Sequence, residues 1–190
     1  DYTQIRSLVK DLIAAYQSCG ISVSLPSLRL DSFAVELAEE IQKARKTGLT
    51  FAPEAGTQRL RDVINKNVSD RDLQDVVQAA FQAGWYRLKL YFMIGLPTET
   101  AEDLDGIAQL ARQVLAWGRE YRTARKRPEV TVSVASFVPK PHTPFQWFGQ
   151  NPLEVLAEKQ EYLMERLRHP GIQFSLHQVE HSFLEAAFSR

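Results

Sequence analysis

The chain has 190 residues, 44% of them apolar, and its 23 basic side chains balance its 23 acidic ones. This length and apolar content predict one globular domain over residues 1–190, and the balanced charge excludes a strong field for nucleic acid or for an anionic membrane. No apolar stretch reaches the roughly 20 residues that cross a bilayer and no signal peptide is visible, which predicts a cytoplasmic protein without a membrane partner.

Apolar stripes with helical spacing recur along the chain. They predict helices over residues 4–18, 32–46, 58–66, 69–84, 101–117, 152–168 and 180–189. Ser69 with Asp72, and Thr100 with Asp103, have the spacing of residues that cap a helix N-terminus. The basic cluster at 119–127 follows a predicted helix, whose C-terminal dipole end favours cations. We therefore interpret it as a solvated helix end rather than a nucleic-acid patch.

Short segments between the helices alternate apolar residues with polar or small ones, over 21–25, 49–52, 88–94, 130–135 and 172–177. Strands separated by helices of this length must be parallel neighbours joined by right-handed crossovers. A doubly wound sheet would be apolar on both faces, whereas each of these strands has one apolar face. The pattern predicts an α/β fold, a partial TIM-like (βα) barrel of parallel strands with helices outside and an open, polar lumen. A half-exposed sheet in an α+β protein is the alternative.

Two strand-to-helix corners carry the strongest functional signals. In Leu90–Thr100 a proline stops a strand, and Gly95 allows a ligand or backbone to come close before the next helix begins. In Phe51–Thr57 the same plan places Glu54 at the C-terminal end of a strand, which is the catalytic rim of a βα barrel. Its carboxylate can accept hydrogen bonds from ribose hydroxyls or an ammonium group, or it can be a simple helix N-terminal acid. Lys66, at the end of the following helix, could reach back to an anionic group.

Further candidates lie along the same rim and lumen. Lys89 faces the proposed lumen and could form a Schiff base, although an ion pair with Glu54 or another lumen acid is the favoured interpretation. Lys140 and His142 lie in a proline-rich segment that would cross the rim, where they contact substrate or belong to a rigid surface connection. Lys89 and His142 are thus the catalytic candidates. Arg29 could bind a carboxylate or phosphate of the substrate, or it is a surface arginine at a helix start.

The corners and their spacing resemble the radical S-adenosylmethionine (radical SAM) superfamily. The resemblance rests on Ala52–Thr57, Leu60-Arg61, Ile64–Lys66 and Phe92–Thr100. It implies that Glu54 contacts the ribose or amino group of SAM and that Lys66 meets its carboxylate. It also implies that adenine packs against Met93, Ile94 and Gly95, and that a strand over Val132–Val138 supplies backbone contacts to the adenine edge near Phe137.

A closer resemblance concerns a bacterial subgroup of Fe–S oxidoreductases that join a cobalamin-binding-like domain to a radical SAM core. It rests on Ser24–Asp31 and Phe137–Trp147. It implies that a reduced 4Fe–4S cluster in the intact protein cleaves SAM to a 5′-deoxyadenosyl radical, which abstracts hydrogen from a small-molecule or macromolecular substrate. An electron donor such as ferredoxin or flavodoxin would then be a partner, and cobalamin is a candidate cofactor in a separate domain.

The chain departs from the family in its cysteines. The Cys-x3-Cys-x2-Cys triad that ligates the cluster is absent, Cys19 is the only cysteine, and the second-strand motif for the SAM amino group is also missing. We therefore expect a fragment with strands three to six of the barrel and one further segment. Such a fragment would be inactive alone, bind no cluster and dimerise through exposed strand edges. The alternatives are a TIM-barrel lyase or aldolase that uses Lys89 with Glu54, and a non-catalytic barrel interaction module.

Overall fold

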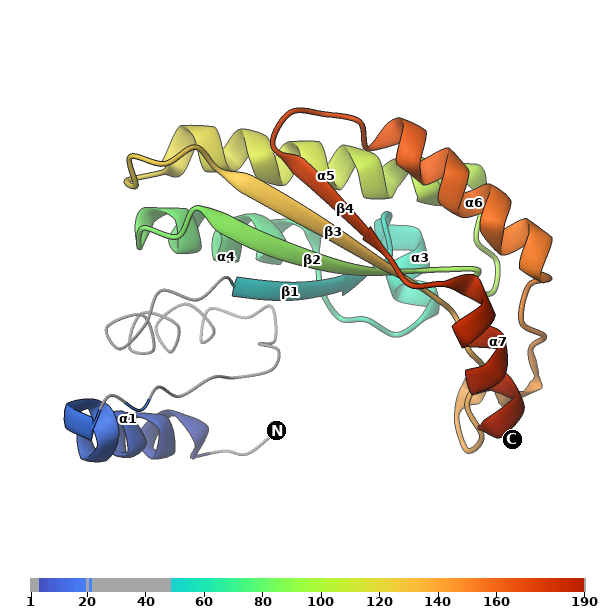
Figure 1. Cartoon of the computed structure of the whole chain (residues 1–190), viewed down its shortest axis with the longest axis horizontal. Helices are drawn as coiled ribbons and strands as arrows, with labels where there is room; N and C mark the ends of the chain where they lie inside the picture. The colour runs from blue at the N-terminus through green and yellow to red at the C-terminus, as the bar shows by residue number, and fades with distance from the viewer. Residues whose placement is uncertain (1–3, 20, 22–48, 190) are drawn as a thin grey trace.

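A computed structural model of the protein describes residues 4–19, 21 and 49–189 (Figure 1). In chain order the elements are helix α1 (Ile5–Tyr16), the 3-10 turn η1 (Gln17–Cys19), β1 (Leu49–Glu54), α3 (Gln58–Val63), α4 (Asp70–Gln82), β2 (Arg87–Ile94), α5 (Ala101–Tyr121), β3 (Glu129–Ser136), the 3-10 turn η2 (Pro144–Trp147), α6 (Leu153–Arg166), β4 (Ile172–Leu176) and α7 (Val179–Phe188). Arg29, the predicted helix over 32–46 and all but the first residue of the predicted strand over 21–25 lie outside the described residues.

The described strands form one parallel sheet of four strands in the order β1-β2-β3-β4. The order along the sheet follows the order along the chain, which is the arrangement of a barrel wall rather than of a doubly wound sheet. Figure 1 shows α4, α5 and α6 on one side of this sheet. The predicted α/β fold with parallel strands and helices outside is therefore confirmed.

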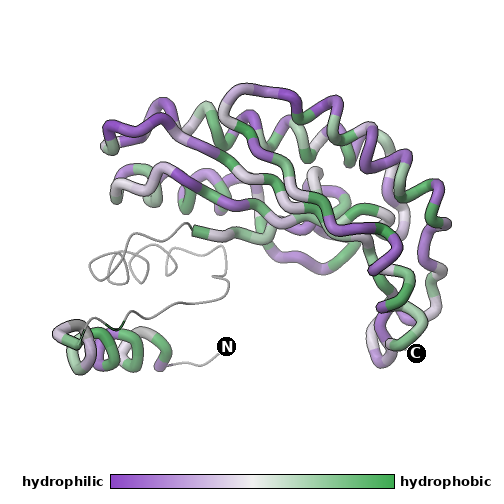
Figure 2. The backbone as a smooth tube through the Cα atoms, in the orientation of Figure 1, coloured by the Kyte–Doolittle hydropathy of each residue, from purple (hydrophilic) through white to green (hydrophobic). Residues whose placement is uncertain are grey.

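Each central strand has one buried face and one half-buried face. Burial alternates along β1 and β2, and Figure 2 shows the matching alternation of hydrophobic and hydrophilic residues along the strands. The buried residues of the strands pack with those of α4, α5 and α6 in one core, which includes Phe51, Leu90, Val132, Val77, Val114 and Leu156. The opposite face, which we call the inner face, carries Thr50, Lys89, Tyr91, Met93 and Thr131. The expected polar or small inner face is thus present.

Local signals explain most of the element boundaries. Ser69 with Asp72, and Thr100 with Asp103, both form the predicted capping boxes. Helix α5 continues past the predicted end at 117 to Tyr121, and Gly118 leaves room for the ring of Phe81, since a Cβ there would lie 2.5 Å from Phe81 Cζ. None of the described helices is long and apolar enough to cross a membrane.

The predicted strand over Val132–Val138 is shifted in the structure. Strand β3 ends at Ser136, so Phe137 and Val138 lie beyond it. The prolines at 139 and 141 explain this early end, because proline lacks the N–H that a parallel ladder needs. The Phe137 N–H still donates to the Ile94 carbonyl at 2.8 Å, so this residue stays attached to the end of β2.

Candidate functional site

The carboxyl ends of the strands bring two of the predicted site residues, Glu54 and Met93, to one edge of the sheet. Glu54 is the last residue of β1 and is in register with Phe92 of β2, while Met93 is in register with Ala135 of β3. Parallel α/β proteins place ligands at this edge, because loops and helix N-termini meet there. We call it the carboxyl edge. The two strand-to-helix corners singled out in the sequence, Phe51–Thr57 and Leu90–Thr100, both lie at this carboxyl edge.

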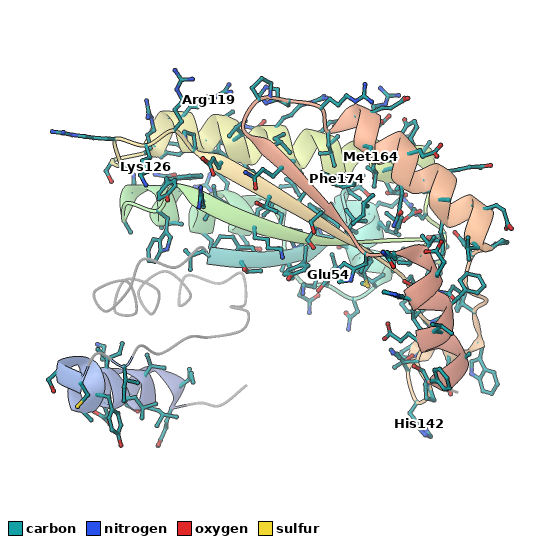
Figure 3. All side chains as sticks on the ribbon, viewed as in Figure 1. Glu54, Arg119, Lys126, His142, Met164 and Phe174 are labelled. Carbon is teal, nitrogen blue, oxygen red and sulfur yellow. The ribbon has the colours of Figure 1, made fainter. Side chains whose placement is uncertain are left out.

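Glu54 and Lys66 form an ion pair at the carboxyl edge. Lys66 Nζ lies 3.4 Å from Glu54 Oε1, and the side chains are 34% and 26% exposed. Glu54 has a φ of +69°, a left-handed conformation that a non-glycine residue adopts rarely and at a cost. Figure 3 shows the Glu54 side chain at the end of the sheet. The two residues predicted to hold the charged groups of SAM are therefore adjacent and accessible.

Arg61 builds the loop that carries Lys66, and sequence reasoning gave it no role. Its guanidinium is 1% exposed and donates to the carbonyls of Ala55 at 3.2 Å and Val68 at 3.1 Å. One contact fixes the residue after Glu54, and the other fixes the chain after Lys66. The sequence did contain a signal for this role, because Arg61 lies among the apolar residues of a short predicted helix. A charged residue at such a position is buried only when its charge is paired.

An apolar cluster lies beside the ion pair. It contains the buried residues Ala55, Leu60, Leu96 and Phe137, with Met93 packed against them. Met93 and Phe137, both predicted to lie near adenine, thus share a cluster with the residue that follows Glu54. The side chain of Ile94 is instead fully buried in the core against the helices. A contact from Ile94 to a ligand would therefore come from its backbone.

A buried carboxylate holds the turn that follows β2. The Gly95 N–H donates to both oxygens of Glu99 at 3.0 Å, and Lys159 of α6 pairs with Glu99 at 2.6 Å. Glu99 is only 2% exposed, so this pair is internal. Gly95 has a φ of +78°, and a Cβ on it would lie 2.9 Å from Leu156 Cδ2. The close approach at Gly95 is thus made by the Leu156 side chain of α6, and not by the ligand or backbone that the sequence predicted. Glu99 and Lys159 were both missed.

A second buried carboxylate ties the two corners together. Asp103 of α5 accepts hydrogen bonds from the Thr100 N–H at 2.8 Å, from the hydroxyl of Thr57 and from the guanidinium of Arg59. Arg59 also donates to the Thr98 carbonyl at 2.9 Å. Burial raises the pKa of Asp103, but the hydrogen bonds from Thr57, Thr100 and Arg59 outweigh burial and hold its pKa below the usual value. The corner after β1 is therefore fixed to the corner after β2.

The other predicted site residues do not converge on Glu54. Lys89 lies on the inner face with Nζ 4.6 Å from the centre of the Tyr91 ring. The favoured interpretation of Lys89 was an ion pair with Glu54 or another acid of the lumen, and no such pair is found among the described residues, where Glu54 pairs with Lys66 instead. The register explains this, since Glu54 faces Phe92, three residues or about 10 Å along the strand from Lys89.

The proline-rich segment after β3 points elsewhere. Lys140 pairs with Glu185 of α7 and donates to the Ser189 hydroxyl at 3.0 Å. His142 has a φ of +61°, and its backbone N–H donates to Gln146 Oε1 at 3.2 Å. Figure 3 shows the His142 side chain at the tip of this segment, pointing away from Glu54. The structure therefore places Lys140 and His142 apart from the Glu54 and Lys66 pair.

The residues of the carboxyl edge fit SAM better than they fit an iron–sulfur cluster. A carboxylate and an ammonium beside an apolar cluster match a zwitterion attached to a nucleoside. The buried Ser133 hydroxyl also has no hydrogen-bond partner, but it lies on the inner face in register with Tyr91 and not at the carboxyl edge. The described residues hold no group of three His, Cys, Asp or Glu side chains arranged for a metal ion, and the exposed Cys19 stands alone. These residues therefore do not fit the cluster.

Comparison with known proteins shows the family of this chain. The family model of the radical SAM superfamily matches residues 1–111, which include both corners. The uncharacterized protein MJ0966 of Methanocaldococcus jannaschii is 36% identical over 154 residues, which is 80% of this chain. The matched part is 31% of that relative, so the chain spans about a third of its length. The family match covers more than half of the chain, and the chain therefore belongs to the radical SAM superfamily.

Proposed function

We propose that the carboxyl edge of β1, β2 and β3 binds SAM as part of a radical SAM enzyme. The observation that carries this proposal is the accessible Glu54 and Lys66 pair beside the apolar cluster of Ala55, Leu96 and Phe137. Membership of the superfamily indicates an enzyme, and SAM is the cofactor that its members use. When bound and reduced, SAM supplies the hydrogen-abstracting chemistry of the superfamily.

The chain's own residues would bind and orient the cofactor. Lys66 would donate to the carboxylate of the methionine part, and Glu54 would accept from its ammonium or from a ribose hydroxyl. The contact between them is 3.4 Å long and partly exposed, so exchanging it for contacts to a ligand costs little. Met93 and Phe137 would cover the adenine and exclude water from it.

A Schiff-base enzyme built on Lys89 has less support. Its ammonium lies over the face of the Tyr91 ring, 4.6 Å from the ring centre, and is engaged in that cation–π contact. Lys89 also lies about 10 Å below the carboxyl edge along the strand. Neither observation favours an aldolase or lyase. The contacts of the Glu54 corner favour SAM instead.

Calorimetric titration tests the proposal with SAM and with its uncharged-sulfur analogue S-adenosylhomocysteine. We expect the 190-residue chain to bind both. Because each contact is a charge-assisted hydrogen bond, Glu54→Gln and Lys66→Met should each weaken binding about tenfold or more. The matched control is the exposed Arg71 and Asp75 pair on α4, where Arg71→Met and Asp75→Asn should leave affinity unchanged. Binding that is absent, or equal in all variants, would contradict the proposal.

A further inference from the structure

A concave site lies at the edge of the sheet opposite the carboxyl edge. A cavity of about 470 Å³ is lined by Arg119, Arg122, Arg127, Pro128, Glu129, Pro170 and Gly171, and we call it the arginine pocket. Glu129 is the first residue of β3 and Gly171 precedes β4, so the arginine pocket lies at the amino ends of these strands. Figure 3 shows Arg119 and Lys126 at the end of the molecule far from Glu54. This volume is within the usual range for small-ligand sites.

The floor of the arginine pocket is held by the backbone of the sheet. The Gly171 carbonyl accepts from the Val130 N–H at 2.9 Å, and the Glu129 N–H donates to the Tyr86 carbonyl at 2.7 Å. Gly171 has a φ of +94° and packs against Leu115, where an added Cβ would lie 3.3 Å from its methyl carbons. The floor is therefore fixed by β2, β3 and the core before any ligand binds.

The wall of the arginine pocket is a braced loop. Arg122, the residue that ends α5, donates from Nη1 to the carbonyls of Arg125 at 3.5 Å and Lys126 at 3.3 Å. These bonds fold the segment after α5 back on itself and keep Arg127 at the mouth of the cavity. The helix dipole explains a cation in the last turn, such as Arg119, but it does not explain Arg127, which lies well beyond the helix.

The positive charge of the arginine pocket is not neutralised. Its lone carboxylate, Glu129, is already paired with Arg87, with Nε and Oε2 2.7 Å apart. Within the part of the chain that the structure describes, Arg119, Arg122 and Arg127 have no ion-pair partner. The chain as a whole has a formal charge of zero, so this is a local concentration of charge and not part of a general basic surface.

We propose that the arginine pocket binds a small ligand with two or more phosphate groups. Guanidinium groups present forked donors that match phosphate oxygens, and several converging on one cavity match a ligand with several such groups. A cavity of about 470 Å³ is larger than a single phosphate requires. The ligand would bind at the edge opposite the proposed SAM site, so the two sites can be occupied together.

Inorganic pyrophosphate is the probe that tests this proposal, by calorimetry at low ionic strength. We expect saturable binding that Arg119→Gln combined with Arg127→Gln weakens about tenfold or more, and that the paired Arg→Lys changes weaken less, because lysine keeps the charge but loses the fork. Both side chains are exposed, so the variants should fold, which circular dichroism would verify. Arg71→Gln on α4 is the matched control and should change nothing.

Two outcomes would overturn the arginine pocket as a phosphate site. One is the absence of pyrophosphate binding, or binding that the double Arg→Gln variant leaves unchanged. The other is binding of a short RNA with no binding of pyrophosphate, which would assign the basic cluster to a nucleic acid instead. Pyrophosphate binding that persists with SAM present, and SAM binding that persists in the double variant, would show that the two sites are independent.

Discussion

At the scale of single residues, the site depends on side chains that fix the backbone of others. Glu54 holds a left-handed conformation, which costs about 1 to 3 kcal/mol for a residue with a Cβ. That conformation persists because Arg61 binds the carbonyl of Ala55 and Asp103 binds the hydroxyl of Thr57, on the chain just after Glu54. Strain of this kind collects at functional sites, since it aims a side chain where a ligand needs it.

Asp103 is the residue whose loss should loosen both corners. Asp103→Asn removes the charge that accepts from Arg59, Thr57 and Thr100, and we expect it to lower the free energy of unfolding by about 2 kcal/mol in urea titrations. Asp75→Asn, in an exposed pair, is the control and should stay within about 0.5 kcal/mol of wild type. A value for Asp103→Asn as small as that of the control would contradict this role.

The same carboxylate predicts a pH dependence. Because the folded protein lowers the pKa of Asp103, its contribution is fully present above the unfolded value of about 3.9 and is lost as pH falls through the lower, folded value. Urea unfolding should be measured at a series of pH values from about 5 downward. Over this range the wild-type protein should lose the free energy of unfolding that the Asp103→Asn variant lacks at every pH. The difference between the two proteins should therefore shrink toward acid. A difference that is constant with pH would show that Asp103 is not charged in the fold.

At the scale of elements, a close crossing positions the corner after β1. An added Cβ on Gly56 would lie 2.3 Å from both the Asp103 carbonyl oxygen and the Ile107 nitrogen, which are backbone atoms of α5. A Cβ added to Gly106 of α5 would in turn lie 2.8 Å from the carbonyl carbon and oxygen of Gly56. The corner that carries Glu54 is thus packed directly on α5 without side chains between them.

This crossing can be tested with two glycines. Gly56→Ala should lower the free energy of unfolding by about 2 kcal/mol or more, because the backbone of α5 must move to admit the methyl group. It should also weaken SAM binding by displacing Glu54. Gly149→Ala is the matched control, since nothing lies within 4 Å of the position of its Cβ. Equal chemical denaturation curves for the two variants would show that the crossing is looser than described.

The elements themselves could be predicted from the sequence, and most of their contacts could not. Strand β2 and helix α4 could be predicted because their signals are local. The first is the alternation of residues from Leu88 to Ile94, and the second is the cap formed by Ser69 with Asp72. Lys159 and Glu99 lie 60 residues apart, and only the packing of α6 on the turn after β2 brings them together. Family resemblance assigned Glu54 and Lys66 to separate groups of SAM, but the ion pair between them was not predicted.

At the scale of the whole molecule, the sheet presents two chemically different edges. The carboxyl edge carries an ion pair and an apolar cluster, and the amino edge carries the unneutralised arginines of the arginine pocket. The order β1-β2-β3-β4 with helices on one side is that of a partial barrel wall, and β4 has only β3 as its strand partner among the described strands. The inner face between the two edges, with Lys89, Tyr91 and Ser133, would then line part of the lumen.

The measurement that tests the central claim most directly is the map of backbone amide shifts in a titration of the chain with SAM, recorded by heteronuclear NMR. We predict that the amides that shift most are those of Glu54, Lys66, Gly95 and Phe137 at the carboxyl edge, while Arg119 and Arg127 at the amino edge stay unchanged. Shifts confined to the amino edge, or no shifts at saturating SAM, would contradict the assignment of the carboxyl edge as a SAM site.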